Sequence, residues 1–85
     1  MIIQTTKKFD KQYAKLKPKI KIKFKSQVGI FVKNPFDKRL RNHALKGKYL
    51  GYRSIDITSD VRALYTVKDD KIILFGFIGS HSQLY

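Results

Sequence analysis

The stretch HALKGKYLGYRSIDITSDVRALYTVKDDKIILFGFIGSHSQLY, from His43 to Tyr85, decides the fold of this chain. It contains three runs with the composition of β-strands, at residues 49–57, 61–67 and 71–78. Short polar stretches separate these runs, and stretches of this kind favour hairpin turns. We therefore predict an antiparallel meander, followed by a short tail over residues 81–85.

Two helices are expected before this meander. After a short strand over 1–5, apolar residues recur at helical spacing over 7–16, and a preceding threonine can cap that helix. Pro18 interrupts the pattern and precedes the segment KIKIKFKSQVGIFV over 19–32, which alternates like a strand but also carries a helical stripe. Its length favours a helix, because strands usually span about five or six residues.

An Asn-Pro pair then ends the second helix, and residues 36–48 are expected to form a long polar connection. Connections of that length in small domains often carry function. The whole pattern predicts an α+β fold over residues 1–85, forming one domain with two N-terminal helices packed on a small antiparallel-rich sheet.

Charge is the strongest feature of the composition. Nineteen Lys and Arg residues oppose six Asp residues and no Glu, for a net charge of +13. Residues 1–41 carry thirteen basic and two acidic side chains, net +11, whereas residues 42–85 carry six and four, net +2. Such a charge favours polyanionic partners, because neutralising phosphates releases counterions. We interpret the first half as an electrostatic platform and the second half as the site.

The sequence contains no cysteine, so disulfides and thiolate metal sites are not expected. No run approaches the roughly 18 apolar residues of a membrane span, and the first residues lack the apolar region of a signal peptide. These features predict a soluble protein of the cytoplasm that has no membrane partner.

The titratable side chains of the second half are the candidates for chemistry. His43 and His81 have the side chain best suited to proton transfer at neutral pH, and they can meet at one end of the sheet. Asp60 lies in a predicted turn, where its ordinary role is to bind nearby backbone. Asp56 falls within a strand, where aspartate is disfavoured, and it faces either solvent or a cleft.

Arg53 and Arg62 lie on neighbouring predicted strands, and a guanidinium matches the oxygens of a phosphate. Tyr85 can stack on a base. No metal-ligand spacing, nucleophile elbow or phosphate loop is present, so neither a metal nor a small-molecule cofactor is expected.

A set of this kind can cleave RNA without a metal, because the 2′-OH of RNA is itself the nucleophile. Such cleavage requires a group that takes the 2′-OH proton, cations beside the phosphate, and an acid that protonates the leaving 5′ oxygen. DNA has no 2′-OH, so this chemistry selects RNA.

Three motifs carry a resemblance to a known family: HALKGKYLGYR (43–53), SDVRALY (59–65) and GSHSQLY (79–85). With two lysine-rich helices before them, they resemble the RelE/ParE superfamily of bacterial toxins, most closely its YafQ-like branch. The resemblance implies the toxin of a type II toxin-antitoxin system that cleaves mRNA on the ribosome and is neutralised by a cognate antitoxin. We expect that antitoxin to be acidic where it covers this basic surface.

The resemblance also implies roles for individual residues. Asp56 stands where the YafQ-like pattern has a histidine and Val61 where it has a tryptophan, whereas Arg62 matches an arginine of other RelE-like toxins. His43, Asp60, His81 and Tyr85 match positions that the family uses at its active site. With Asp56 and Arg62 added, the residues that we predict to be catalytic are His43, Asp56, Asp60, Arg62, His81 and Tyr85. The residues predicted to bind RNA phosphates are Arg53, Lys46 and Lys48.

Two other functions fit the same fold, since fold alone does not define function. One is a ParE-like toxin that inhibits DNA gyrase by binding; the other is a degenerate family member that only binds RNA. The paired His43 and His81 with the terminal aromatic residue favour cleavage over inhibition, whereas Asp56 and Val61 leave the degenerate member open.

Overall fold

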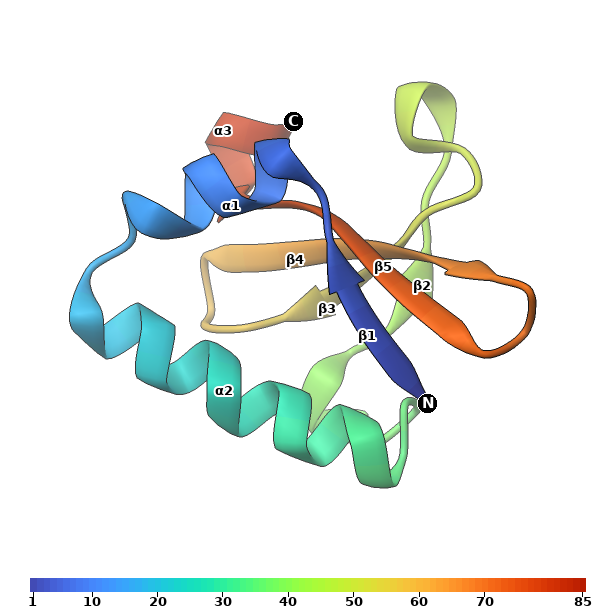
Figure 1. The fold of residues 1–85 in the computed structure, drawn as a ribbon. Helices are drawn as coiled ribbons and strands as arrows, with labels where there is room; N and C mark the ends of the chain where they lie inside the picture. Colours follow the sequence, from blue (N-terminus) through green and yellow to red (C-terminus); the bar gives the residue numbers. More distant parts are fainter.

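A five-stranded sheet with helices against one of its faces forms the architecture in the computed structural model, which describes residues 1–85 (Figure 1). The strand order is β1-β5-β4-β3-β2, in which β1 runs parallel to β5 and all other neighbours are antiparallel. The strands are β1 (Ile2–Thr5), β2 (His43–Ala44), β3 (Arg53–Asp56), β4 (Val61–Lys68) and β5 (Ile72–Ser80). The predicted α+β class is confirmed.

The two N-terminal helices are α1 (Lys7–Ala14) and α2 (Pro18–Lys33). The Thr6 side chain caps α1 by accepting a hydrogen bond from the backbone N–H of Phe9 at 3.0 Å. The prediction that this helix reaches residue 16 is wrong by two residues, because a proline at 18 disfavours helical backbone at the residue before it. The helical interpretation of the KIKIKF segment is confirmed.

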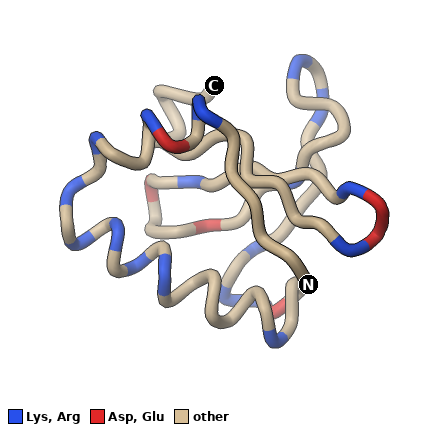
Figure 2. The backbone as a smooth tube through the Cα atoms, in the orientation of Figure 1, with Lys and Arg blue, Asp and Glu red and all other residues tan.

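Aromatic rings join the helices to the sheet. Phe9 of α1 lies 5.9 Å from the ring of Phe75 on β5, and Phe31 of α2 lies 5.0 Å from the ring of Tyr65 on β4. All four side chains are buried, so the apolar stripes of both helices cover the same face of the sheet. Figure 2 shows that the Lys and Arg positions are spread along α1 and α2. None of the helices is long and apolar enough to cross a membrane.

The predicted meander is present with altered bounds. The strand expected from residue 49 begins only at Arg53, because a 3-10 turn, η2 (Gly47–Tyr49), precedes it. Gly47 and Gly51 have φ values of 65° and 93°, a conformation that favours glycine and interrupts a strand. The last strand continues to Ser80, two residues beyond the predicted end at 78.

The connection over 36–48 and the tail over 81–85 are more regular than expected. The connection contains a 3-10 turn, η1 (Lys38–Leu40), and the short edge strand β2, which pairs with β3. The tail forms a helical turn, α3 (His81–Leu84). Ser80 and Gln83 make a reciprocal capping box at its start, a motif readable in the sequence that the prediction of a plain tail missed.

Replacement of Phe31 by alanine tests the helix-to-sheet packing. Phe31 is fully buried, so Phe31→Ala should lower the free energy of unfolding by about 3–5 kcal/mol in urea denaturation. Phe36 is 66% exposed, and Phe36→Ala, the matched control, should cost less than about 1 kcal/mol. Equal losses in the two variants would contradict this account of the core.

Candidate active site

The candidate site lies on the sheet face opposite the two N-terminal helices. Ile55 of β3 belongs to the buried core beneath the helices, so its neighbours Ser54 and Asp56 point to the other face. Arg62 on β4 is the register partner of Asp56 and points the same way. Strand alternation therefore places a hydroxyl, a carboxylate and a guanidinium side by side on a face that no long helix covers.

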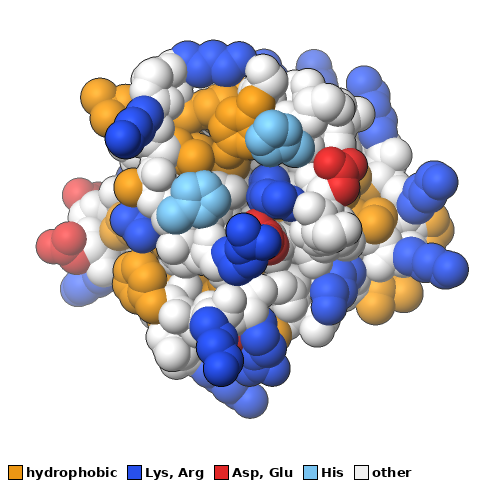
Figure 3. Space-filling model, turned by 180° about the vertical axis from the view of Figure 1, so that it is seen from behind, with side chains coloured by type: hydrophobic (Ala, Val, Ile, Leu, Met, Phe, Trp, Pro, Cys, Tyr) orange, Lys and Arg blue, Asp and Glu red, His pale blue; other side chains and the backbone are white.

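Segments from two other parts of the chain turn this polar floor into a cleft. The segment around β2 supplies Arg41, His43 and Leu45, and α3 supplies His81 and Tyr85. The cleft has a volume of about 330 Å³. Figure 3 shows this face with both histidines, and with basic and acidic side chains between them. The structure thus brings the two predicted histidines to one site, although 38 positions separate them in the sequence.

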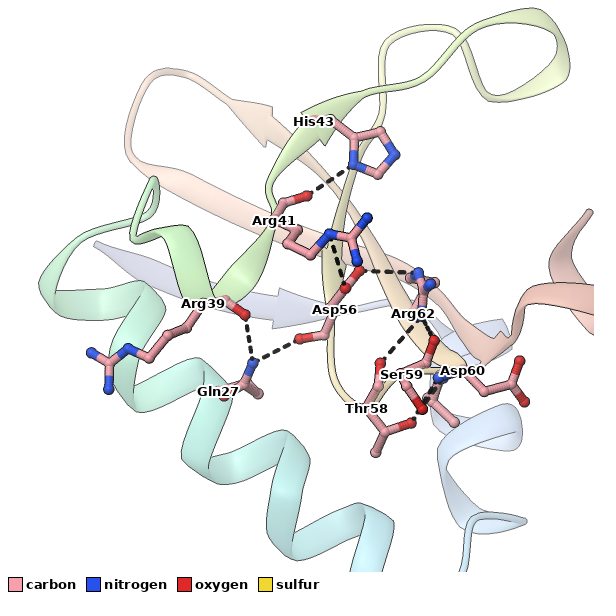
Figure 4. A network of polar contacts seen from close by, with 10 residues as sticks. Gln27, Arg39, Arg41, His43, Asp56, Thr58, Ser59, Asp60 and Arg62 are labelled. Atoms are coloured by element: carbon pink, nitrogen blue, oxygen red, sulfur yellow. Dashed lines mark hydrogen bonds and ion pairs between the residues drawn. The ribbon is translucent and has the colours of Figure 1, made fainter.

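Asp56 occupies the centre of a polar network (Figure 4). Its carboxylate pairs with Nε of Arg62 at 3.0 Å and with Nε of Arg41 at 3.7 Å. Its backbone carbonyl accepts a hydrogen bond from Nε2 of Gln27, a buried residue of α2, at 2.8 Å. Asp56 therefore faces the cleft and not bulk solvent, and α2 holds its backbone in place from the opposite side of the sheet.

Arg62 is held rigidly. Its Nη1 donates to the backbone carbonyls of Thr58 and Ser59 at 3.2 and 3.0 Å, while its Nε faces Asp56. Its side chain is only 16% exposed. The turn between β3 and β4 therefore fixes this cation in the floor of the cleft.

The ring of His43 has a defined orientation. Its Nδ1 lies 2.9 Å from the backbone carbonyl oxygen of Arg41. A carbonyl oxygen only accepts hydrogen bonds, so in the neutral imidazole Nδ1 carries the proton and Nε2 carries the lone pair. Arg41 directs its carbonyl there from a left-handed backbone conformation, φ 49° and ψ 45°, at the end of η1. This arrangement makes Nε2 of His43 a proton acceptor.

This tautomer is directly testable. In ¹⁵N–¹H correlation spectra of the neutral imidazole at alkaline pH, His43 should show the Nδ1–H form. His81 is the internal control, because its ring nitrogens form no hydrogen bond within the protein and should show the ordinary tautomer mixture. A His43 spectrum dominated by the Nε2–H form would contradict the assignment.

His81 is placed by the start of α3. Its backbone N–H donates to the carbonyl oxygen of Asp60 at 2.9 Å, and its ring centroid lies 4.8 Å from that of Tyr85. The hydroxyl of Tyr49 donates to the carbonyl oxygen of Leu84 at 2.7 Å and ties α3 to η2. The capped turn therefore holds an imidazole and an aromatic ring together at the rim of the cleft.

Four predicted site residues do not line the cleft: Asp60, Arg53, Lys46 and Lys48. The backbone carbonyl of Asp60 accepts a hydrogen bond from the N–H of His81, but the Asp60 side chain makes no polar contact in the structure. Arg53 is occupied elsewhere, because its Nε donates to Oδ1 of Asn42 at 2.8 Å and its guanidinium lies over the ring of Phe36. Lys46 directly precedes η2 and Lys48 lies within it, and neither lines the cleft.

Sequence reasoning missed Arg41, Leu45 and Ser54. Ser54 lies two positions before Asp56, so the strand period could have found it. Its hydroxyl is buried and has no hydrogen-bond partner. Arg41 lay within the predicted connection, and no signal in the sequence indicates that a left-handed turn brings it to Asp56.

The charges around Asp56 suit an anion better than a cation. No group of three or more His, Cys and acidic side chains gathers anywhere in the structure. The only carboxylate in the cleft is that of Asp56, and it already faces two guanidinium groups. These two positive charges disfavour a cation and favour an anion.

A second ion pair lies just outside the cleft. Hydrogen bonds from the side chain and the backbone N–H of Arg39 lower the pKa of Asp37 from 3.8 to about 2. Because this pKa is lower in the folded chain, the pair stabilises the fold above about pH 4, and this contribution disappears as the pH falls through about 2. The Arg39 side chain is 66% exposed and that of Asp37 22%, so the pair lies at the surface, and neither residue lines the cleft.

The Asp37 pKa can be measured by following its carboxyl ¹³C shift. We expect a midpoint near 2 in the wild type and a return toward 3.8 in Arg39→Gln, which removes the donors. Asp10, which accepts a hydrogen bond from Thr5 and has no arginine partner, serves as the control, and its carboxyl ¹³C shift at neutral pH should be the same in both proteins. An unchanged Asp37 midpoint in the variant would contradict this cause.

Solved structures show which class of protein combines this fold with such a cleft. YafQ from E. coli strain BL21(DE3) is 25% identical, covers 98% of this chain and 96% of its own, and superposes with a TM-score of 0.80. A copper-bound mutant toxin from Helicobacter pylori is 29% identical, with coverages of 100% and 99% and a TM-score of 0.75. The YoeB/ParE toxin from Agrobacterium tumefaciens shares the fold at 20% identity, coverages of 95% and 99%, and a TM-score of 0.78.

The fold is therefore that of the RelE/ParE/YoeB-like bacterial toxins. The family model described as "Bacterial toxin of type II toxin-antitoxin system, YafQ" matches residues 1–85, and the chain belongs to this family. The resemblance drawn from the three sequence motifs is confirmed. A comparison with curated proteins gave no match.

Proposed function

We propose that this toxin is a ribosome-dependent mRNA endonuclease that acts in the cytoplasm as one domain of residues 1–85. The observation that carries the proposal is the single cleft in which His43 and His81 flank the guanidinium groups of Arg41 and Arg62. A protein that only binds a partner has no need for two imidazoles around an anion-binding floor.

In the proposed reaction Nε2 of His43 takes the proton of the RNA 2′-OH, and the freed oxygen attacks the adjacent phosphorus. Protonated His81 gives its proton to the leaving 5′ oxygen as the P–O5′ bond breaks, leaving a 2′,3′-cyclic phosphate and a 5′-OH end. The hydrogen bond to the Arg41 carbonyl keeps the proton on Nδ1 of His43 and the lone pair on Nε2, which supports the role of His43 as the base. Each proton transfer contributes about 10²–10⁴-fold to the rate.

The other cleft residues serve this chemistry in the proposal. Arg62 stabilises the charge that develops on the phosphate, and Asp56 orients Arg62. Tyr85 is 49% exposed beside His81, so one face of its ring can stack on a base next to the scissile bond. Asp60 stays a predicted site residue that reaches the substrate only if its side chain moves.

The basic surface supports a ribosomal location for the reaction. None of the lysines of α1 and α2 is buried, and we propose that they bind ribosomal RNA, so cleavage should fall steeply with added salt. The ribosome would also position the mRNA in the cleft, so that the reacting groups are held together. Free RNA is therefore expected to be a poor substrate.

We further propose a cognate antitoxin as the protein partner. E. coli YafQ, 24% identical to this chain, has been solved in complex with DinJ (TM-score 0.71, coverages of 98% and 96%). With a net charge of +13, this toxin would attract an antitoxin segment that is acidic.

Inducible expression in a bacterium tests the nuclease proposal. Wild type should arrest growth and create new 5′ ends in a reporter mRNA mapped by primer extension. His81→Ala should reduce cleavage by about 10²–10⁴-fold, because the general acid is lost. Ser82→Ala, an exposed neighbour on α3 that does not line the cleft, is the control and should cut like wild type.

The outcomes separate the rival functions. Growth arrest with intact mRNA, equal in wild type and His81→Ala, would contradict the nuclease proposal and point to gyrase inhibition. Absence of toxicity in every variant, with RNA binding retained, would identify a degenerate RNA-binding member.

A further inference from the structure

The two arginines of the cleft are held very differently. Arg62 is nearly buried, and its Nε and Nη1 already face a carboxylate and two carbonyl oxygens. The Arg41 side chain is 76% exposed, makes no hydrogen bond, and has only the long 3.7 Å approach to Asp56. Arg62 is therefore a fixed part of the floor, whereas the Arg41 guanidinium is free to turn toward a ligand (Figure 4).

The charges of the cleft leave Arg41 without a full counter-ion. Asp56 supplies one negative charge, and Arg62 and Arg41 supply two positive charges, a net of +1 with neutral histidines. The short ion pair joins Asp56 to Arg62. One exposed positive charge at the mouth of the cleft therefore remains for an anion with a single negative charge, which is the charge of a phosphodiester.

We infer that Arg41 is a phosphate-binding residue of this toxin. Its guanidinium moves from Asp56 to the two non-bridging oxygens of the bound phosphodiester, in the paired geometry that arginine forms with phosphate. Asp56 then keeps Arg62 as its sole partner. The inference rests on the proposed function for its substrate, RNA, but phosphate binding by Arg41 is measurable without cleavage.

The same residue would act on the reaction twice. The backbone carbonyl of Arg41 sets the tautomer of His43, and its side chain holds the phosphate that the 2′ oxygen attacks. Because one left-handed residue carries both groups, the carbonyl that orients the base and the cation that binds the phosphate start from the same point of the backbone. Arg41 and Arg62 are the only Lys or Arg residues that line the cleft.

The test compares Arg41→Gln with Arg39→Gln. Both variants lose one exposed positive charge from the same segment, but Arg39 pairs with Asp37 and does not line the cleft. The probe is a short single-stranded RNA with every 2′-hydroxyl methylated, which cannot be cleaved, titrated by NMR at constant low salt. Arg41→Gln should weaken its binding by about 10- to 100-fold, the loss typical of a charge-assisted contact. Arg39→Gln should weaken it by less than about 2-fold.

Two further measurements exclude a structural explanation. Arg41→Lys keeps the charge without the paired donors, so its affinity should lie between those of wild type and Arg41→Gln. The His43 tautomer should stay unchanged in Arg41→Gln, because the carbonyl that sets it belongs to the backbone.

Cleavage on ribosomes by the same variants separates the two proposals. Equal binding and equal cleavage by Arg41→Gln and Arg39→Gln would overturn the role of Arg41 and leave the nuclease proposal standing. If the wild type binds the probe but never cleaves mRNA, and only Arg41→Gln loses probe binding, the nuclease proposal would be overturned and the phosphate site supported. A wild type that neither binds the probe nor cleaves would overturn both.

Discussion

The ion pair between Asp56 and Arg62 is the interaction on which the cleft depends. Both side chains are largely buried, and each would be a costly unpaired charge without the other. A pair of this kind contributes little net stability, because desolvation offsets its attraction. Its effect is positional, since it holds one guanidinium in the floor of an otherwise open sheet face and leaves Arg41 as the freer cation at the rim.

The sheet separates the two tasks of this small protein. On one face, the aromatic side chains of α1, α2, β4 and β5 form the apolar core, and on the other face the alternate residues of β3 and β4 form the cleft. Gln27 connects the two, because its amide reaches from α2 to the carbonyls of Asp56 and Arg39. These hydrogen bonds anchor the backbone beneath the site to a helix of the core.

Much of the fold was predictable because local signals agree with it. Pro18, the apolar periodicity and the hairpin turns indicate two helices and a meander, and the structure contains them. The misplaced bounds have local causes in the positive-φ glycines near β3 and the proline after α1. The capping box of α3 was readable but overlooked, and the two-residue strand β2 is too short to carry a periodic signal.

The sequence by itself determined the fold class, the family through its three motifs, and the two histidines as candidate groups for chemistry. Only the tertiary structure decided which side chains share the cleft: it added Arg41 and Ser54 and left Arg53, Lys46 and Lys48 outside. The reason is physical. Backbone periodicity and turn chemistry act over a few neighbouring residues, whereas the cleft joins β2, β3, β4 and α3 through strand register and one left-handed turn.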